Sequence, residues 1–334
     1  MNTGKQWIIA VISLGLTAFP TAAHAAEPAV YTRTDFAMDT VVTETVYSTG
    51  EDITDSVIGI LKDLETNLIS WTNENSQIYR LNEKSGEEVQ VSEELSGYLK
   101  QILKLSEDSN GAMDPTLGRV IRLWDIDGEN PHVPADPELK SLMENVGYEK
   151  VSLSGNKVTL EEGCTLDLGA VGKGIGCDAV ADYLEQQPEI SGMILNLGGS
   201  SVMTYGEKTD GTAWKVAVTD PRDTEGDYLG VISLNGKEFL STSGDYEKYF
   251  IEDGKRYHHI LDSASGYPVD NGITSVTVVC DNGLDADGLS TACFALGVEK
   301  GRELLEKYEA DGLFVDEAGE IYMTEGMEER FERR

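Results

Sequence analysis

The sequence predicts a single α+β body with a helical N-terminal part and a sheet-rich C-terminal part. Apolar residues recur at helical spacing in several segments between residues 53 and 124, whereas β-branched, alternating segments dominate from residue 150 onward. No Pro-, Gly- or Ser-rich linker separates the two parts, and 334 residues are enough to build one large core.

The N-terminal part alternates helices with loops. Residues 36–47 are β-branched and alternating, which indicates a strand, and the apolar spacing from Ile53 to Leu68 then indicates an amphipathic helix. Ser76 and Ser92 are placed to cap two further helices. A short helix ends at Trp124, and residues 125–136 are expected to form an excursion loop.

The C-terminal part is expected to consist mostly of strands. Two helices interrupt it, over residues 171–184 and 287–308. The strands are predicted over 158–160, 193–197, 214–219, 230–234, 239–243 and 274–280.

The chain is strongly acidic, with 60 Asp and Glu against 26 Lys and Arg and a formal net charge of −34. A field of that sign repels phosphate backbones and anionic lipid, so no nucleic acid is expected among the partners. A phosphate-bearing ligand would need a local lysine, backbone N–H groups or a divalent cation.

Residues 1–25 have the pattern of a secretory signal peptide, which leaves 26–334 as the mature domain. Lys5 precedes an apolar segment of about 13 residues, too short for a spanning helix, which needs roughly 20. We therefore expect an extracytoplasmic protein, periplasmic or at the cell surface, either released or held at the membrane by an uncleaved signal. The four cysteines could pair there, but their positions favour small core residues: Cys164, Cys177, Cys280 and Cys293.

The first candidate site is the glycine-rich segment 167–174, a predicted strand-to-helix turn. Such a turn presents free N–H groups and a positive dipole end to a phosphate, and Lys173 adds a cation. The Walker spacing is absent, and the dinucleotide pattern at Gly174, Gly176 and Ala179 lacks its acidic ribose partner. The alternative is a tight turn packed against a sheet.

The second candidate is the acidic segment 285–291. Asp287 and Thr291 are four residues apart, so on a helix they share one face and offer oxygen ligands for Mg²⁺. The alternative is a helix N-cap with solvated acids. A cation at this turn would let a chain of this charge bind a pyrophosphate.

The third candidate is the pair His258 and His259. On a strand these neighbours face opposite sides, so only one can serve a given site, as a base or as a donor. A histidine satisfied within the strand is the alternative. The sequence contains no Gly-x-Ser-x-Gly elbow, zinc-spaced His/Cys cluster or His-Glu-x-x-His motif.

These segments together resemble one family, the ApbE family of FAD:protein FMN transferases, over nearly the whole mature chain. The order of the motifs makes the resemblance specific. They are Met-Asp-Thr at 38–40, Gly-Ala-Met-Asp-Pro-Thr at 111–116, Asp-Leu-Gly-Ala-x-x-Lys-Gly at 167–174, Asn-Leu-Gly-Gly at 196–199, Ser-Gly-Asp-Tyr at 243–246, His-His-Ile-Leu-Asp at 258–262 with Gly-Tyr-Pro at 266–268, and Ala-Asp-Gly-Leu-Ser-Thr at 286–291.

The resemblance implies a mixed α/β body around a flavin cleft, with FAD as substrate and Mg²⁺ as cofactor. Such an enzyme moves FMN onto a threonine hydroxyl of an acceptor flavoprotein through a phosphoester bond and releases AMP. By motif, the metal ligands would be Ala170 (through its carbonyl), Asp287 and Thr291. The residues expected to contact FAD are Met38, Ala112, Met113, Asp114, Asp167, Lys173 and Ile260.

The base that activates the threonine is expected to be His259, next to Ile260, with Asp285 beside the metal turn as the competing candidate. An ordinary imidazole base titrates at about pH 6–7. Asp39 stands where the family has glycine, and Trp71 is displaced from the family's aromatic position.

Two other functions stay open: a Mg²⁺-dependent FAD pyrophosphatase that yields FMN and AMP, and a non-catalytic FAD-binding protein. Extracytoplasmic placement suggests that the acceptor is a membrane-bound or exported electron-transfer protein.

Overall fold

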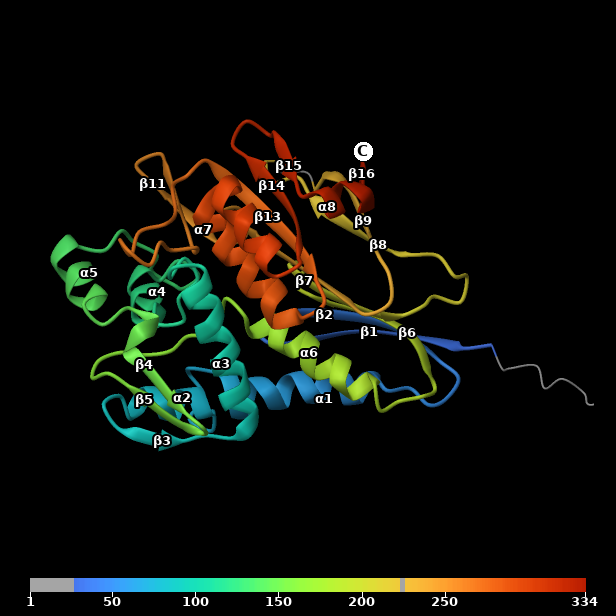
Figure 1. Cartoon of the computed structure of the whole chain (residues 1–334), viewed down its shortest axis with the longest axis horizontal. Helices are drawn as coiled ribbons and strands as arrows, with labels where there is room; N and C mark the ends of the chain where they lie inside the picture. The colour runs from blue at the N-terminus through green and yellow to red at the C-terminus, as the bar shows by residue number, and fades with distance from the viewer. Residues whose placement is uncertain (1–26, 223–225) are drawn as a thin grey trace, which may run out of the picture.

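One antiparallel sheet of eight strands forms the centre of the molecule (Figure 1). The computed structural model describes residues 27–222 and 226–334, so the predicted signal peptide lies outside the described residues. The strand order is β1-β2-β6-β7-β10-β13-β14-β15. The bounds are β1 Ala29–Ala37, β2 Thr40–Ser48, β6 Ile190–Leu197, β7 Ser201–Gly206, β10 Glu238–Gly244, β13 Ile273–Cys280, β14 Asp311–Asp316 and β15 Ile321–Met323.

Different layers cover the two faces of this sheet. One face carries the helices α1 (Thr54–Leu64, continued by the π-helical turn η1, Glu65–Ile69), α6 (Gly172–Leu184) and α7 (Gly283–Lys307). There, Val42 and Val46 of β2 are buried in one cluster with apolar residues of α1 and α6. The other face packs against a small sheet and a short helix: β8 Trp214–Thr219, β9 Tyr228–Leu234, β16 Phe331–Arg333 and α8 Glu325–Arg330.

The helical part lies beside α7 and shares its core. Leu95 and Leu105 of α3 belong to the same buried cluster as Leu289 and Phe294 of α7, so the two parts fold as one body. The elements of this region are α2 Gln77–Glu83, α3 Glu93–Asp108, α4 Gly118–Trp124, α5 Asp136–Met143, η2 Tyr148–Lys150, and the strands β3 Glu88–Gln90, β4 Val151–Ser154 and β5 Lys157–Leu160. A separate hairpin joins β11 Tyr249–Glu252 to β12 Lys255–His258.

The predicted fold class is confirmed, and so are most of the elements. Ser76 and Ser92 cap α2 and α3 by accepting hydrogen bonds from the backbone N–H groups of Ile78 and Leu95. All four cysteines are free thiols; Cys164, Cys177 and Cys293 are buried as expected for core residues, whereas Cys280 is partly exposed. No helix in the described part of the chain is long and apolar enough to cross a bilayer.

Two predicted boundaries were wrong. The strand expected over 36–47 is a hairpin, because Met38 and Asp39 both adopt positive φ, 54° and 55°, and reverse the chain between β1 and β2. The excursion loop expected over 125–136 is confirmed to within one residue, since α5 begins at Asp136. The last long helix begins at Gly283 instead of Asp287, and its backbone is broken at Gly297, where φ is 76°.

Candidate functional site

The first turns of α6 and α7 lie against each other and are joined in both directions. Asp287 of α7 accepts a hydrogen bond from the backbone N–H of Gly174 in α6 at 2.8 Å. Asp178 of α6 accepts hydrogen bonds from the N–H groups of Gly283 and Leu284 at 2.7 and 2.8 Å. A Cβ on Gly174 would lie 2.1 Å from the Gly283 carbonyl oxygen, so glycine permits this approach.

A buried carboxylate and a lysine occupy this junction. Asp287 is 5% exposed, and its other oxygen accepts a hydrogen bond from Ser201 Oγ at 3.0 Å. Burial raises the pKa of Asp287, while the nearby ammonium of Lys173 opposes that shift. Lys173 is hydrogen-bonded to Ser200 Oγ. Thus the two predicted site residues Lys173 and Asp287 are brought together.

Sequence reasoning missed the two serines that hold them. Ser200 and Ser201 directly follow the Asn-Leu-Gly-Gly segment at 196–199, whose two glycines lie in the turn between β6 and β7. The Asn-Leu-Gly-Gly segment is one of the motifs that carry the family resemblance, and it is the sequence signal nearest to these serines. The serines were overlooked because serine in a turn is common and carries no pattern by itself.

Thr291 supplies a second oxygen on the same helix. Its hydroxyl lies 3.4 Å from the Asp287 carbonyl and 3.2 Å from Ser243 Oγ. The turn that contains Ala170 reaches the same helix, because the neighbouring Val171 would lie 3.2 Å from a Cβ on Gly288. Carboxylate, hydroxyl and carbonyl oxygens are hard ligands that suit Mg²⁺.

The donor set contains a single carboxylate. Among residues 27–222 and 226–334, no group of three or more His, Cys, Asp and Glu side chains is placed to hold a metal ion. Mg²⁺ commonly binds through one or two carboxylates, water and substrate phosphates, so this set fits a cation that arrives with a phosphate ligand.

Asp285 lies on another side of α7. Its carboxyl group lies near Gln101 of α3, which lowers its pKa, whereas Asp287 contacts α6 and β7. Burial raises the pKa of Asp285, and one of its oxygens has no hydrogen-bond partner. The structure therefore does not bring Asp285 together with the residues around Asp287.

Three of the predicted FAD contacts come from loops that are tied together. The backbone N–H of Asp167 donates to the Pro115 carbonyl at 2.8 Å, next to Asp114. Asp114 accepts hydrogen bonds from the N–H groups of Thr116 and Tyr148 at 2.8 and 2.9 Å, and burial raises its pKa. Ala112 lies in the same loop, half-buried.

Two other predicted contacts have side chains in the core. Met113 and Ile260 belong to the large buried cluster that also contains Leu168 and Val171 of the next predicted site segment. The chain segment after Ile260 is joined to this region by Ser263, whose hydroxyl donates to the Gly111 carbonyl at 2.6 Å.

Met38 approaches α6 from the β1–β2 turn. Its Sδ would lie 2.7 Å from a Cβ on Gly176, so the thioether fills the space that this glycine leaves. The backbone N–H of Met38 donates to Glu65 Oε2 at 2.7 Å, where the π-helical turn η1 begins. π-helical turns occur frequently at functional sites. Met38 therefore packs on α6 one turn beyond Lys173.

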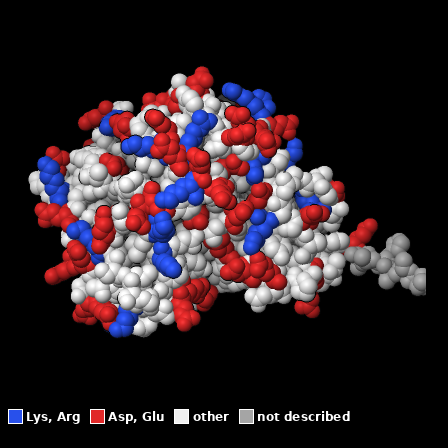
Figure 2. All heavy atoms as spheres, viewed as in Figure 1, with Lys and Arg blue, Asp and Glu red and all other residues white. Residues whose placement is uncertain are grey.

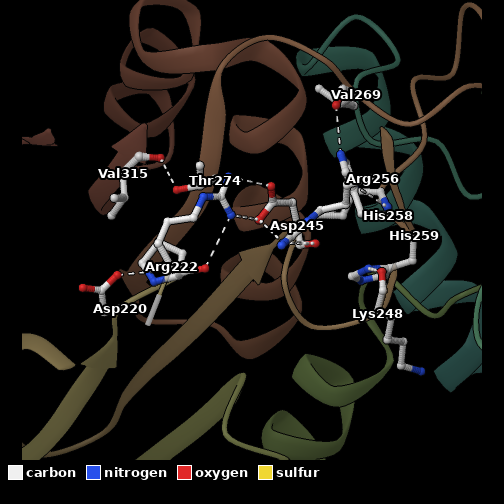
Figure 3. Close-up of polar contacts among 12 residues, drawn as sticks. Asp220, Arg222, Asp245, Lys248, Arg256, His258, His259, Val269, Thr274 and Val315 are labelled. Atoms are coloured by element: carbon white, nitrogen blue, oxygen red, sulfur yellow. Dashed lines mark hydrogen bonds and ion pairs between the residues drawn. The ribbon is translucent and has the colours of Figure 1, made fainter. Parts of the chain in front are cut away.

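The two adjacent histidines differ in their surroundings (Figure 3). His258 is buried, its Nε2 lies 2.9 Å from the Val269 carbonyl, and its Nδ1 accepts from the Ile260 N–H at 3.3 Å. His259 makes one such contact, between Nδ1 and the Lys248 carbonyl at 3.3 Å. Because a carbonyl can only accept, Nδ1 of His259 carries the proton and Nε2 keeps its lone pair. Burial lowers the pKa of His259 to about 4.

The Ser-Gly-Asp-Tyr segment at 243–246 carries an ion pair that sequence reasoning did not foresee. Asp245 accepts two hydrogen bonds from the guanidinium of Arg222, at 2.8 and 3.0 Å, while its backbone N–H donates to the Thr274 carbonyl (Figure 3). The carboxylate is mostly buried, so a bidentate arginine compensates its charge. Asp245 therefore anchors the end of β10.

The fold and the site define an α+β protein with a lysine and a buried carboxylate at two joined helix starts. The chain belongs to the ApbE family, whose model matches residues 38–314. A FAD:protein FMN transferase of Klebsiella pneumoniae (strain 342) is 32% identical, over 90% of this chain and 94% of that protein. A FAD:protein FMN transferase of Treponema pallidum (strain Nichols) is 30% identical, over 97% and 95%.

Solved structures of ApbE proteins have folds similar to that of this chain. The crystal structure of the ApbE protein of Thermotoga maritima superimposes with a TM-score of 0.83 at 32% identity and covers 92% of this chain and 100% of that one. Flavin transferase ApbE from Vibrio cholerae has a TM-score of 0.81 at 27% identity, with coverage of 91% and 99%.

Proposed function

We propose that this protein is a flavin transferase that moves FMN from FAD to a threonine hydroxyl of an acceptor flavoprotein and releases AMP. The main observation behind the proposal is that Lys173 lies near the carboxylate of Asp287, where the first turns of α6 and α7 are hydrogen-bonded to each other. Relatives named FAD:protein FMN transferase match over nine-tenths or more of the chain, which supports the same activity.

The residues that would hold Mg²⁺ are Asp287, Thr291 and the carbonyl of Ala170. The fit rests on their chemistry, since all three offer hard oxygens, and on the burial of Asp287, whose ionised form a nearby cation would stabilise. A bound Mg²⁺ would neutralise charge on the pyrophosphate.

The chain itself positions the reacting groups and supplies a positive charge. The threonine oxygen forms a bond to the phosphorus of the FMN half, and the bond from that phosphorus to the oxygen of the leaving AMP breaks. Lys173 supplies a cation at the start of α6, where the helix dipole also favours negative charge. Phosphoryl transfer depends mainly on such placement and charge neutralisation.

His259 is the residue that we propose to accept the threonine proton. Its Nδ1 is held by the Lys248 carbonyl, so Nε2 is the nitrogen able to accept. A pKa of about 4 keeps the ring neutral throughout the physiological range. The electrostatic influence of Lys173 on this pKa supports a place near the phosphate-binding lysine. Asp285 is the weaker candidate because it contacts α3.

One experiment separates the three candidate functions. The protein is incubated with FAD, Mg²⁺ and a flavoprotein that carries a candidate threonine. Covalent flavin fluorescence on that flavoprotein, with AMP in equal amount, supports the transferase. Free FMN with AMP indicates the pyrophosphatase, and intact bound FAD indicates a binding protein.

We also propose that the protein acts outside the cytoplasm. The signal-peptide pattern at residues 1–25 supports export, so the acceptor would be a membrane-bound or exported electron-transfer protein. Fractionation of cells that express the full chain, followed by N-terminal sequencing of the mature protein, tests both the export and the cleavage after Ala25.

A further inference from the structure

Strand β1 forms an unprotected edge of the central sheet. It spans Ala29–Ala37, pairs with β2 alone among the described strands, and contains neither a bulge nor a proline. Proteins normally protect such an edge with a short strand, a charged side chain, a proline or a bulge, because its backbone groups can pair with another chain. A regular edge of nine residues is therefore suited to binding a further strand.

The backbone of every second β1 residue faces this free edge. The register of the two-residue turn at 38–39 directs the N–H and C=O groups of the even-numbered residues from Val30 to Phe36 away from β2. The Phe36 N–H agrees with this direction, because it donates to Asp35 Oδ1 at 2.8 Å. The other even-numbered residues present their N–H groups to an added strand.

The side chains of the same residues belong to an uncharged surface. Its exposed members on β1 and β2 are Val30, Thr32, Thr34, Phe36, Val41 and Thr43. Phe36 and Val41 lie opposite each other and are 58% and 54% exposed. The chain has a net charge of −34, and carboxylates are scattered over the face of the molecule shown in Figure 2. An exposed neutral surface with two large apolar side chains therefore favours a neutral partner.

This surface reaches the proposed transfer site at the end where β1 turns into β2. The Val41 carbonyl accepts a hydrogen bond from the Gly198 N–H at 2.9 Å. Gly198 stands two residues before Ser200, which is hydrogen-bonded to Lys173. The turn between the strands also carries Met38, which packs on α6. A strand added along β1 would therefore end close to the start of α6.

The N-terminal segment leads directly into β1. Only residues 20–28 lie between the apolar part of the predicted signal, residues 7–19, and the start of the strand, and they span at most about 35 Å. A retained signal would hold β1 within that distance of a membrane, where a membrane-bound acceptor would lie. Since β1 precedes residues 38–314, which match the family model, the family motifs do not include this edge.

We propose that the free edge of β1 binds an extended, uncharged segment of the acceptor flavoprotein as an added strand, with the target threonine just beyond it. This inference rests on the proposed function. Main-chain hydrogen bonds to β1 would supply affinity, and contacts with Phe36 and Val41 would supply specificity. The threonine would follow the added strand toward Lys173.

The test uses the full-length protein and a labelled, uncharged peptide that alternates valine and serine over about eight residues and ends in Gly-Thr. Binding is measured by fluorescence anisotropy with FAD and Mg²⁺ present. Thr32→Pro removes one outward N–H, and proline is tolerated where the N–H of an edge strand faces solvent. Affinity for the peptide should fall about tenfold or more. Thr32→Ala, the matched control, keeps the N–H and should bind within about twofold of the unmodified protein.

N-methylation of the peptide gives a second test. An added strand directs the N–H groups of every second residue to β1, so methyl groups on one alternate set should abolish binding, whereas those on the other set should largely preserve it. This comparison uses the unmodified protein, so it decides the question even where Thr32→Pro does not fold. No binding to the unmodified protein, or an equal response to the two sets, would overturn the docking proposal.

Two other occupants of the edge would also overturn it. A dimer of the unmodified protein in sedimentation velocity that Thr32→Pro converts to a monomer would assign the edge to a second copy. Binding to phosphatidylcholine vesicles that Thr34→Lys abolishes, with no binding of the peptide, would assign the surface to lipid. Failure of the proposed function looks different, since the peptide would still bind but the unmodified protein would form no covalent flavin on any acceptor.

Discussion

Asp287 and Gly174 join the two helices of the site through one hydrogen bond of 2.8 Å from backbone to carboxylate. The same contact fixes the orientation of the carboxylate proposed to hold the metal and of the helix turn that carries Lys173. Asp178 ties the helices again from the other side by accepting hydrogen bonds from the N–H groups of Gly283 and Leu284. The site is therefore assembled by the packing of α6 on α7, and it should depend on that packing.

Replacement of Gly174 by alanine should separate the two helix starts. The new Cβ would lie 2.1 Å from a backbone oxygen, which cannot rotate away, so we expect a loss of about 1–3 kcal/mol of stability. Gly59→Ala in α1 is the matched control, because nothing lies within 4 Å of its Cβ, and it should stabilise by about 0.5–1 kcal/mol. Urea unfolding curves measure both. Equal stability of the two variants would contradict the tight junction.

Glu65→Ala should weaken FAD binding by releasing the β1–β2 turn. Glu65 accepts the N–H of Met38, which has a positive φ, so the hydrogen bond of about 1 kcal/mol helps hold an unfavourable backbone conformation. Asp39→Gly should restore much of the affinity, because glycine adopts positive φ without strain. Flavin fluorescence titrations of the two single variants and the double variant measure their FAD affinities. If the effects of the two substitutions on FAD affinity simply add, Glu65 acts independently of the turn.

The transfer rate should not titrate with His259 between pH 5 and 8. We expected an ordinary imidazole value at about 6–7, but burial lowers the pKa of His259 to about 4. The ring is then neutral above that value, so its protonation limits the rate only near pH 4. His259→Gln should lower the rate about 10²–10⁴-fold at pH 7 if the ring is the base.

His258→Gln is the companion variant to His259→Gln. Both nitrogens of His258 are engaged by backbone groups, so its loss should lower the melting temperature. A larger loss of transfer in a fully folded His258→Gln would reverse the assignment.

Glu44→Gln should stabilise the protein at alkaline pH. Both carboxylate oxygens of Glu44 are buried without hydrogen-bond partners, and burial raises its pKa to about 8. The unfolded chain releases this proton first, so the unmodified protein loses stability as the pH rises from about 4.5 toward 8. At pH 8 the variant should be more stable by roughly 2–4 kcal/mol, and at pH 4 the two should be similar.

The charged groups that act on Glu44 are Arg33, which lowers its pKa, and Asp52, Asp35 and Asp55, which raise it. Exposed Glu303 is the control position for the same substitution. Parallel stability–pH curves for Glu44→Gln and the unmodified protein would contradict a buried carboxyl of this kind.

Local sequence rules predicted the elements whose signals are local. Ser76 and Ser92 cap helices as their spacing indicated, since an N-cap depends on two or three neighbouring residues. The hairpin at Met38 and Asp39 was missed because neither residue favours positive φ, and the Glu65 contact that supports the turn comes from another element.

The site was predictable only in part for the same reason. Asp287 and Lys173 stood in recognisable motifs, but their partners Ser200 and Ser201 come from a turn that tertiary packing brings to them. Asp285 shares the motif of Asp287 and yet contacts a different helix, because residues two positions apart on a helix point in different directions. The signal peptide at 1–25 and the roles of the individual residues stay predictions.

The most direct test of the transferase is the amount of covalent flavin formed per AMP released, compared between the unmodified protein and Asp287→Asn. With FAD, Mg²⁺ and a threonine-bearing flavoprotein, we predict one covalent FMN on the acceptor for each AMP. We also predict that Asp287→Asn forms neither product while its fold is retained. AMP released together with free FMN, or Mg²⁺-dependent transfer retained in Asp287→Asn, would contradict the account.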